Sequence, residues 1–364
     1  MSSELFDALT YLEKEKGIDK NVLLEALEAA LISAYKKNFN SSANVRVELS
    51  EEAGTMKVYA RKVVVEELEN ELEELTLDEA RDVNLSYNID DIVEIEVTPK
   101  DFGRIAAQAA KQVVTQRVRE AERGIIFSEY EDREEDVMTG IIQRVDPNFV
   151  YVDLGKVEAK LAVAEQISTE TYNVHDRIKV YVTKVENTSK GPQILISRAH
   201  PGLLKRLFEM EVPEIYDGTV EVKSISREAG DRSKISVYAN DEEVDPVGSC
   251  VGPKGQRVQA VVDELHGEKI DIVEWSEDPI VYISNALSPS KVVDVLVDED
   301  NKSSTVVVPD YQLSLAIGKR GQNARLAAKL TGWKIDIKSE TAAKEEGIEF
   351  HNALPIDAQE TLLD

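Results

Sequence analysis

The sequence predicts a multidomain α+β protein. Its 364 residues suggest two or three domains at about 150 residues each. The hydrophobic share of 42% is large enough to form folded cores and excludes disorder over the whole length. A run of short strands in the middle of the chain and a repeated unit of strands and helices in its second half indicate how these domains are built.

The first part of the chain, residues 1–125, predicts an α+β domain. Residues 4–38 carry apolar side chains at three- and four-residue steps, which is typical of helix, with an interruption at Gly17. After them the apolar period changes to two, which predicts strands. These strands are expected over residues 45–49, 56–65 and 92–97.

A long helix is predicted at the end of this domain, over residues 101–123. Asp101 can cap its N-terminus and Gly124 can end it. Four cations fall on the helices of this domain, and two of them, seven residues apart, share one helix face. On the sequence alone they are solvated surface charges. They are Lys36, Lys37, Arg104 and Lys111.

Residues 134–199 predict a small five-stranded barrel. Five short strand candidates, separated by turn residues, lie within about 65 residues, which is typical of a closed barrel of the OB type. Phe149 and Tyr151 lie on one face of a strand, and Tyr181 lies on another. Such aromatics either pack in the core or stack on bases. Stacking on a base contributes about 1–3 kcal/mol for each ring. Both alternatives stay open on the sequence.

Residues 203–345 contain an internal repeat. One copy runs from Gly252 to Ile272 and the other from Gly318 to Ile337. Each reads G-x-x-G-Q, then about ten helical residues, then G-x-K-I-D-I. Because two alternating strands precede each copy, each unit predicts a strand pair, a short helix, a tight loop, a helix and a final strand.

The two G-x-x-G loops are candidate nucleic-acid sites. Glycines let the backbone approach a phosphate closely, and the helix that follows offers free N–H groups and a positive dipole end. Two copies in this context are typical of tandem KH modules of the prokaryotic, α/β type, whose loop clamps about four nucleotides of a single strand. The alternative is that the glycines only close helix–helix turns. We expect these modules over residues 202–276 and 277–345. The candidate RNA-binding residues are Gly252, Pro253, Lys254, Gly255, Gln256 and Arg257 in the first loop, and Gly318, Lys319, Arg320, Gly321, Gln322 and Arg325 in the second.

The charge of the protein is unevenly distributed. The formal net charge is −27, which excludes a uniformly basic nucleic-acid coat. Residues 311–334 nevertheless contain no acid and five bases. Since charges beyond about 8 Å are largely screened at physiological salt, a polyanion would respond to this local window; the alternative is a solvated helix face. The five bases are Lys319, Arg320, Arg325, Lys329 and Lys334. Residues 346–364 form an acidic tail that is expected to be flexible.

Catalysis has little support in the sequence, and nothing in it indicates a cofactor or a membrane span. Carboxylates are abundant enough to leave a metal-binding cluster open, but no carboxylate is singled out. The four histidines lie far apart, and the single Cys250, a candidate buried thiol, excludes a disulfide framework or a zinc site built on several thiolates. Motifs of metalloproteases, serine hydrolases and nucleotide-binding loops are missing. There is no signal-peptide pattern and no run of about 18 apolar residues. We therefore expect a cytoplasmic protein that is not an enzyme and binds no cofactor or metal.

A barrel followed by two KH repeats resembles the NusA family of bacterial transcription elongation factors, in which the barrel is an S-one type of OB fold. The resemblance covers about residues 1–345 and fits members without C-terminal acidic repeats. The stretches that carry it are LEKEKGIDKNVLLEALEAAL and DFGRIAAQAAKQVV near the start, VDPVGSCVGPKGQRVQAVVDELHGEKIDIVEW in the first repeat and LSLAIGKRGQNARLAAKLTGWKIDI in the second.

The resemblance implies an elongation factor that enhances hairpin-dependent pausing and intrinsic termination and takes part in antitermination. Residues 1–125 would bind bacterial RNA polymerase at the flap near the RNA exit channel, while the barrel and the KH modules bind nascent RNA. Other Nus-type factors are further candidate partners, and we expect a monomer without membrane contact. The family's hairpin-RNA contacts would fall on Lys36, Lys37, Arg104 and Lys111.

Two other functions stay open on the sequence. A polymerase-independent RNA-binding protein, for instance in ribosome assembly or RNA chaperoning, would share the barrel and the KH repeats. A nuclease or phosphorolytic enzyme with such appendages would need a large catalytic domain, for which residues 1–125 are too short.

Overall fold

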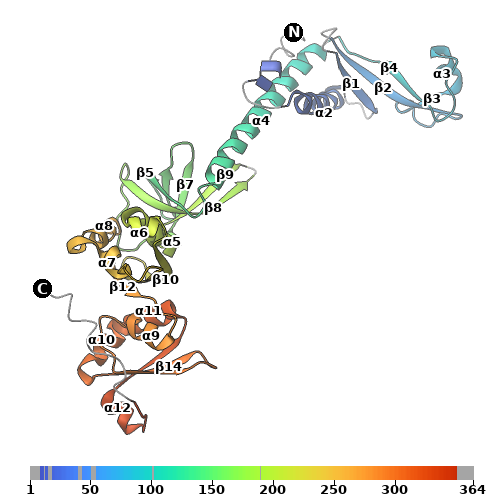
Figure 1. Cartoon of the computed structure of the whole chain (residues 1–364). Coiled ribbons are helices and arrows are strands. Elements are labelled where there is room, and N and C mark those ends of the chain that lie inside the picture. The colour runs from blue at the N-terminus through green and yellow to red at the C-terminus, as the bar shows by residue number, and fades with distance from the viewer. Residues whose placement is uncertain are drawn as a thin grey trace. The chain divides into compact units, whose positions relative to one another are not determined.

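The computed structural model forms two compact units, Met1–Ser128 and Glu129–Asp364, whose elements are labelled in Figure 1. The expected interruption at Gly17 and the expected cap at Asp101 lie outside the described residues. The same is true of residues 351–364 of the acidic tail. The described residues are 9–11, 13–14, 19–39, 43–50, 55–100, 102–188 and 190–350.

The first unit packs two helices on a four-stranded sheet, with a short helix at the far end of that sheet. Strand β1 pairs antiparallel with β2, and β2 also pairs with β3 and β4. The main core joins Leu27 and Leu31 to Val45 and Phe102. The elements are α2 (Lys20–Phe39), β1 (Val45–Ser50), β2 (Thr55–Val65), β3 (Glu74–Thr76), α3 (Leu77–Val83), β4 (Ile92–Glu96) and α4 (Phe102–Glu131).

The prediction that Gly124 ends the long helix is wrong, because α4 continues to Glu131. Gly124 is exposed, and a Cβ there would meet nothing within 4 Å. A glycine at such a position costs only about 1 kcal/mol relative to alanine. The added residues are tied down, since Tyr130 is buried and its hydroxyl donates to the carbonyl of Leu154 over 3.0 Å.

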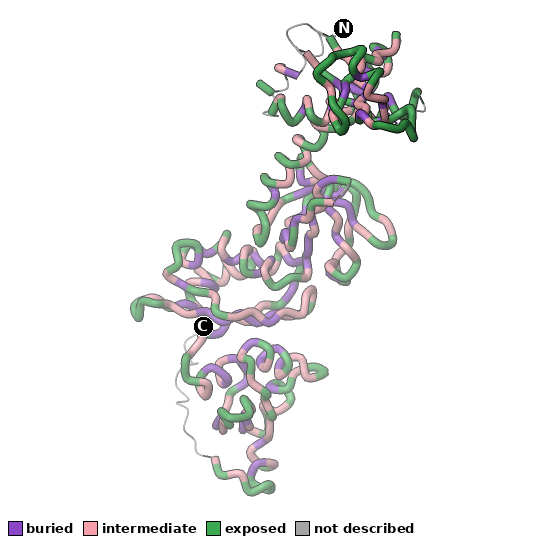
Figure 2. Tube along the Cα trace, turned by 90° about the vertical axis from the view of Figure 1, so that its right-hand side faces the viewer, coloured by how far each residue is buried: buried purple, intermediate pink, exposed green. Residues whose placement is uncertain are grey.

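The second unit begins with the predicted five-stranded barrel, which is confirmed. Its strands close in the order β5-β6-β7-β9-β8. The parallel contact between β7 and β9 completes the closure. Buried residues gather along the strands (Figure 2). The strands are β5 (Val137–Val145), β6 (Phe149–Asp153), β7 (Glu158–Ala162), β8 (Arg177–Thr188) and β9 (Gly191–Ser197).

The two predicted KH modules follow and are also confirmed. Each has a three-stranded sheet whose first two strands are antiparallel and whose last two are parallel. The first module consists of α5 (Pro201–Glu211), α6 (Pro213–Tyr216), β10 (Val220–Glu228), β11 (Arg232–Ala239), α7 (Pro246–Val251), α8 (Gln256–Glu264) and β12 (Lys269–Glu274). The second consists of α9 (Pro279–Ala286), β13 (Asp294–Asp298), β14 (Ser303–Val308), α10 (Leu313–Ile317), α11 (Gln322–Thr331) and β15 (Lys334–Ser339), followed by α12 (Glu340–Glu345).

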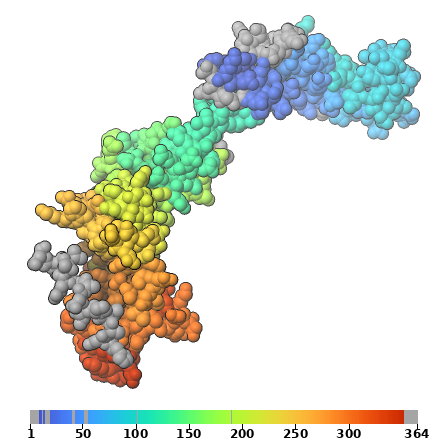
Figure 3. Space-filling model, viewed as in Figure 1, coloured from blue at the N-terminus to red at the C-terminus, as the bar shows by residue number. Residues whose placement is uncertain are grey.

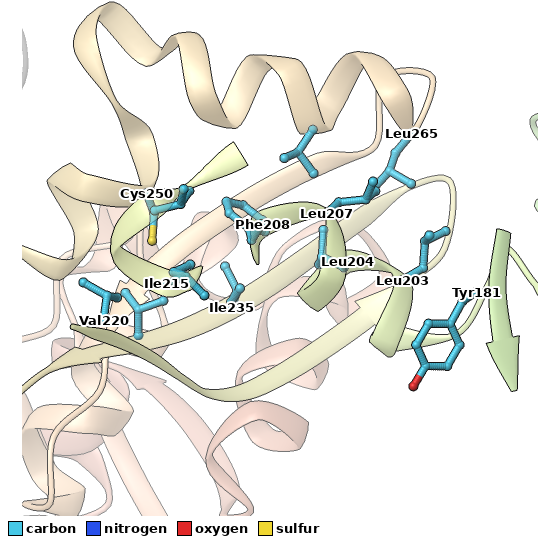
Figure 4. Close-up of a cluster of buried hydrophobic side chains, with 13 residues drawn as sticks. Tyr181, Leu203, Leu204, Leu207, Phe208, Ile215, Val220, Ile235, Cys250 and Leu265 are labelled. Atoms are coloured by element: carbon cyan, nitrogen blue, oxygen red, sulfur yellow. The ribbon is translucent and has the colours of Figure 1, made fainter. Parts of the chain in front are cut away.

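The buried core of the first module includes Tyr181 from the barrel (Figure 4), and Val137 of β5 packs against it. The Tyr181 ring stacks on the His200 ring, with centroids 4.8 Å apart and planes 7° apart. Gly202 lies against the same ring, so that a Cβ there would come within 2.4 Å of it. Of the two alternatives left open for Tyr181, the structure therefore favours core packing.

A buried ion pair of the barrel lies at its junction with the first module. The Arg198 guanidinium, completely buried, donates to the carboxylate of Glu170, whose side chain is 2% exposed. Arg198 also donates to the carbonyl oxygen of Glu264, at the end of α8, over 3.0 Å. The Arg198 guanidinium thus forms charge-assisted hydrogen bonds to both Glu170 and Glu264 at the junction. The low dielectric of this buried place strengthens these hydrogen bonds.

The second module packs on the outer face of the first sheet. The Tyr282 hydroxyl of α9 donates to Ser236 Oγ of β11 over 2.9 Å. The ammonium of Lys234, also completely buried, donates to Asp271 and to the carbonyl of Ser288 over 3.1 and 2.7 Å. Figure 3 shows the yellow and gold atoms of the first module in contact with the orange atoms of the second.

None of the helices in the described part of the chain is long and apolar enough to cross a bilayer.

Candidate nucleic-acid interface

The two G-x-x-G loops have the same backbone conformation. The first glycines, Gly252 and Gly318, have φ/ψ of 73°/174° and 76°/172°. The second glycines, Gly255 and Gly321, lie in the left-handed region at 73°/14° and 74°/17°. The residue before the second glycine is also left-handed in both copies. The repeat seen in the sequence is therefore a repeat of conformation.

The two glycines of each loop have different surroundings. A Cβ on Gly252 would come within 2.7 Å of the Arg257 side chain. A Cβ on Gly318 would come within 2.7 Å of the backbone nitrogen of Asn323. A Cβ on Gly255 or Gly321 would meet nothing within 4 Å. The first glycine thus allows the loop to pack on its own helix, whereas the second leaves open space where the backbone of a ligand can approach.

Arg257 and Asn323 occupy the same position, five residues after the first glycine, and both hold their loop to the preceding helix. Arg257 donates to the carbonyl of Ser249 over 2.6 Å and to Glu214 over 2.9 Å. Asn323, which is buried, donates to the carbonyls of Ala316 and Leu287 over 3.0 Å each. Sequence analysis missed the role of Asn323, for which the shared spacing was the available signal.

The cations of the basic window do not form one surface. Lys319 and Arg320 lie exposed at the tip of the second loop and form no ion pair with any residue that the structure describes. Arg325 is paired with Glu228 of the first module over 2.6 Å. Lys334 lines a groove on the sheet. In the first loop Lys254 is exposed, and Pro253 precedes it.

Gln256 and Gln322 follow the second glycine of each loop. Gln256 is exposed at the start of α8. The Gln322 amide donates to Glu228 and Asp231, on the first module, over 2.8 and 2.7 Å. The start of α11 is therefore joined to the hairpin between β10 and β11.

The barrel presents an aromatic and cationic cluster across three neighbouring strands. Phe149 and Tyr151 lie with ring centroids 6.1 Å apart. The guanidinium of Arg144 covers the Tyr151 ring at 3.4 Å, and the ammonium of Lys160 lies 5.8 Å from the Phe149 ring. Tyr151 is only 8% exposed, and burial is the main cause that raises the pKa of its hydroxyl. Phe149 is therefore the more accessible ring for stacking on a base.

In the first unit, α2 and α4 border a groove. Small apolar side chains and amides line it, among them Ala34, Ala109, Gln108 and Gln112, and Lys37 contributes the charge. Lys36, Lys37, Arg104 and Lys111 are all exposed. Of these four cations only Lys37 lines the groove. Arg104 and Lys111, seven residues apart, share another face of α4.

Comparison with known domain families covers almost the whole described chain. The NusA N-terminal domain matches residues 4–124, and the S1 RNA binding domain matches residues 131–197. The NusA-like first and second KH domains match residues 198–275 and 279–345. A transcription termination/antitermination protein NusA from Bacillus subtilis is 71% identical over 96% of this chain and 94% of its own length.

The chain belongs to the NusA family. The NusA of Halalkalibacterium halodurans, also named a transcription termination/antitermination protein, is 69% identical over 99% of this chain and 96% of its own. The solution structure of the N-terminal domain of the B. subtilis NusA is 65% identical, covers 34% of this chain and 99% of that domain, and gives a TM-score of 0.32. The order of the family's domains is the order of the barrel and modules described above.

Proposed function

We propose that this protein is a transcription elongation factor that binds RNA polymerase and nascent RNA in the cytoplasm. It lengthens hairpin-dependent pauses, assists intrinsic termination and joins antitermination complexes with other Nus-type factors. The observation that carries the proposal is the pair of G-x-x-G loops with one conformation on two modules that share a buried junction. Its NusA relatives are named transcription termination/antitermination proteins, which agrees with the proposal.

The proposal gives each part of the chain one task. Residues 1–125 bind the polymerase at the flap beside the RNA exit channel. Residues 134–199 form the barrel, and residues 202–276 and 277–345 form the two KH modules, which together bind the emerging RNA. Residues 346–364, without a basic side chain other than a histidine, repel RNA and stay clear of it.

The two loops hold the RNA backbone. Lys254, Lys319 and Arg320 supply exposed charge, and the open space at Gly255 and Gly321 admits a phosphate. Each KH loop contacts about four nucleotides. Because the modules are joined by buried hydrogen bonds, one strand that contacts both loops loses less entropy than it would on two independently moving modules.

The groove between α2 and α4 faces hairpin RNA. Lys37 lines it, and Lys36, Arg104 and Lys111 are exposed elsewhere on the same two helices. The four cations contact the phosphates of the stem. The mechanism needs no bond chemistry. A preference of about 1.4 kcal/mol for the paused over the active polymerase multiplies their ratio by ten, and a few phosphate contacts supply that much.

The test is the lifetime of a hairpin-stabilised pause, measured on bacterial RNA polymerase with the full chain. We expect wild-type protein to lengthen the pause. Lys319→Asp/Arg320→Asp should shorten it again, because the second loop then repels phosphate. The matched variant Lys291→Asp/Lys344→Asp changes exposed charges elsewhere and should behave as wild type.

A second variant separates the roles of the two units. Lys37→Glu/Arg104→Glu should abolish the effect on the pause while leaving the binding of free single-stranded RNA intact. If the wild-type protein neither associates with the polymerase nor changes the pause, yet binds free RNA, the polymerase-independent RNA-binding function replaces the proposal.

A further inference from the structure

The outer face of the second sheet carries a groove. Leu296, Thr305 and Asp336 are neighbours across β13, β14 and β15, and they line the groove, which has a volume of about 410 Å³. The opposite face of this sheet packs on the module's own helices, through residues such as Val306 and Val308. The groove is therefore on the side that the module itself does not fill.

The internal repeat gives this row of residues a counterpart in the first module. The K-I-D-I motifs align Asp336 with Asp271, and the strand registers then align Thr305 with Lys234. The first module's row is covered, since Lys234 is completely buried and the Asp271 side chain is 18% exposed. The Asp336 side chain is 68% exposed.

Two helices of the second module cover the row in the first. Helix α9 contributes Tyr282, which bonds to Ser236. Helix α11 packs on β10 and β11 and presents an amide and a guanidinium at positions i and i+3, Gln322 and Arg325. Both donate to Glu228 at the hairpin between the strands.

Among the residues that the structure describes, the second sheet has only the first of these two covers. Val307, the counterpart of Ser236, is completely buried, and α12 packs on β14 and β15. Figure 1 draws α12 on the side of β14 that faces away from α9 and α11. Helix α12 therefore covers the part of the second sheet that corresponds to the part of the first sheet covered by α9. The groove lies at the part of the second sheet that corresponds to the part of the first sheet covered by α11.

The acceptors for a second helix are present at the groove. Asp298 is the counterpart of Glu228 by strand register, and Glu299 and Asp300 follow it. All three are exposed. With Asp336, which lies 3.7 Å from the Lys338 ammonium, they place four carboxylates at the groove against one lining cation, Lys334. The excess of negative charge favours a basic partner over nucleic acid.

We propose that this groove is a docking site for an amphipathic helix of a partner protein. The helix carries amide or guanidinium donors at positions i and i+3, which bond to Asp298 and its neighbours, and it lays small apolar side chains over Leu296 and Thr305. Residues 351–364 of this chain do not fit that description, because they contain three acids and no lysine or arginine. The inference stands on the repeat and does not depend on the proposed transcriptional role.

The test uses a synthetic peptide with the sequence of residues 321–332, GQNARLAAKLTG, held helical by a lactam bridge. It is titrated into the isotope-labelled full chain and followed by NMR. We expect shifts of the backbone amides of Thr305 and Asp336. The same peptide with the changes Gln322→Glu and Arg325→Glu should cause no shifts.

Variants of the protein complete the test. Asp298→Lys/Asp336→Lys reverses two exposed charges at the groove and should weaken peptide binding by about tenfold. Glu277→Lys, an exposed change outside the groove, should leave it unchanged. An unchanged fold is checked on the same spectra. No binding at millimolar peptide, equal binding by all variants, or shifts confined to the barrel or the first sheet would overturn the proposal.

Discussion

Arg325 of the second KH module donates from Nε to Glu228 of the first over 2.6 Å. The same guanidinium reaches the carbonyl of Arg320 over 3.3 Å, within its own loop. The carboxylate raises the pKa of Arg325, and the pKa of Glu228 is lowered in return. A cation that the sequence offers to RNA is thus used to join the two modules.

The first prediction concerns the salt dependence of RNA binding. Each phosphate contact on a single strand contributes about −0.7 to the log–log slope. Lys319→Ala/Arg320→Ala should therefore flatten the slope by about 1.4, whereas Arg325→Ala should change it little. Fluorescence anisotropy with a single-stranded RNA at several potassium chloride concentrations measures both. Equal flattening by Arg325→Ala would show that Arg325 leaves Glu228 to contact phosphate.

The second prediction separates the two glycines of one loop. Gly318→Ala should destabilise the second module by several kcal/mol for two reasons. The new Cβ would clash with the backbone of Asn323, and alanine would be strained at the positive φ of this position. Gly321→Ala meets open space and suffers only the left-handed strain of about 1–2 kcal/mol. It should fold but lose RNA affinity, because the methyl group stands where the phosphate approaches.

Thermal unfolding and RNA binding, measured on both glycine variants, distinguish these effects. Gly255→Ala in the first loop has the same open surroundings and should repeat the behaviour of Gly321→Ala. If Gly321→Ala bound RNA as wild type does, the loop would hold no backbone at that point.

The third prediction is that Phe149→Ala weakens RNA binding more than Tyr151→Ala does. The Phe149 ring is the more exposed, and stacking on a base is worth about 1–3 kcal/mol. Arg144 already covers the Tyr151 ring. Anisotropy titrations with pyrimidine-rich RNA make the comparison, and Val163→Ala, an exposed apolar change outside the cluster, is the control. A larger loss with Tyr151→Ala would mean that Arg144 moves aside for a base.

The fourth prediction concerns the buried pair of Arg198 and Glu170. Burial raises the pKa of Glu170, but the hydrogen bond and the charge of Arg198 outweigh it, so that the pKa is lowered overall. The pair therefore contributes stability above the unfolded pKa of about 4.3 and loses it as the pH falls through the folded pKa. Glu170→Gln should cost about 3–5 kcal/mol near pH 7.

Denaturant unfolding between pH 3 and pH 7, at steps of about one unit, tests this pair. Glu170→Gln should flatten the pH profile at its acid end. Glu186→Gln breaks the exposed pair with Lys184 and should cost less than about 1 kcal/mol. Equal costs for the two variants would contradict a stabilising role of the buried pair.

The fifth prediction uses the single cysteine as a probe of folding. Burial raises the pKa of the Cys250 thiol to about 12, and the side chain is completely buried. Since only the thiolate reacts, labelling by a disulfide reagent at pH 8 should be at least about 10³-fold slower in the native protein than in guanidinium. Fast stoichiometric labelling of the native protein would contradict the buried position.

Much of the fold was predictable because it follows from local sequence patterns. The alternation of residues 137–197 predicted the barrel, and the repeat predicted both modules with their loops. The end of α4 was not predictable from the sequence. The helix tolerates Gly124 because its following residues are held by a tertiary contact, the hydrogen bond from Tyr130 to Leu154. The buried place of Tyr181 depends on Gly202 and likewise follows from packing between two domains.

The candidate site was predictable as a set of loops but not as a set of free charges. The spacing of Gly318 and Gly321 predicted where the loop lies, and the structure shows its backbone conformation. The partners of Arg325 and Gln322 lie 91 to 97 residues earlier in the chain. No local pattern reveals such pairs, so sequence analysis counted a cation that the fold already uses.

The parallel pairing of β11 with β12, and of β14 with β15, has a consequence for how such a chain can grow. The crossover between the parallel strands keeps its two helices, α7 and α8 in the first module and α10 and α11 in the second, on one side of the sheet. The other side of the first sheet is then free to receive the next module. The arrangement is a solenoid of two units, extendable by duplication, in which stability is a sum over units and their interfaces. Helix α12 packs on β14 and β15 and so covers part of the corresponding side of the second sheet.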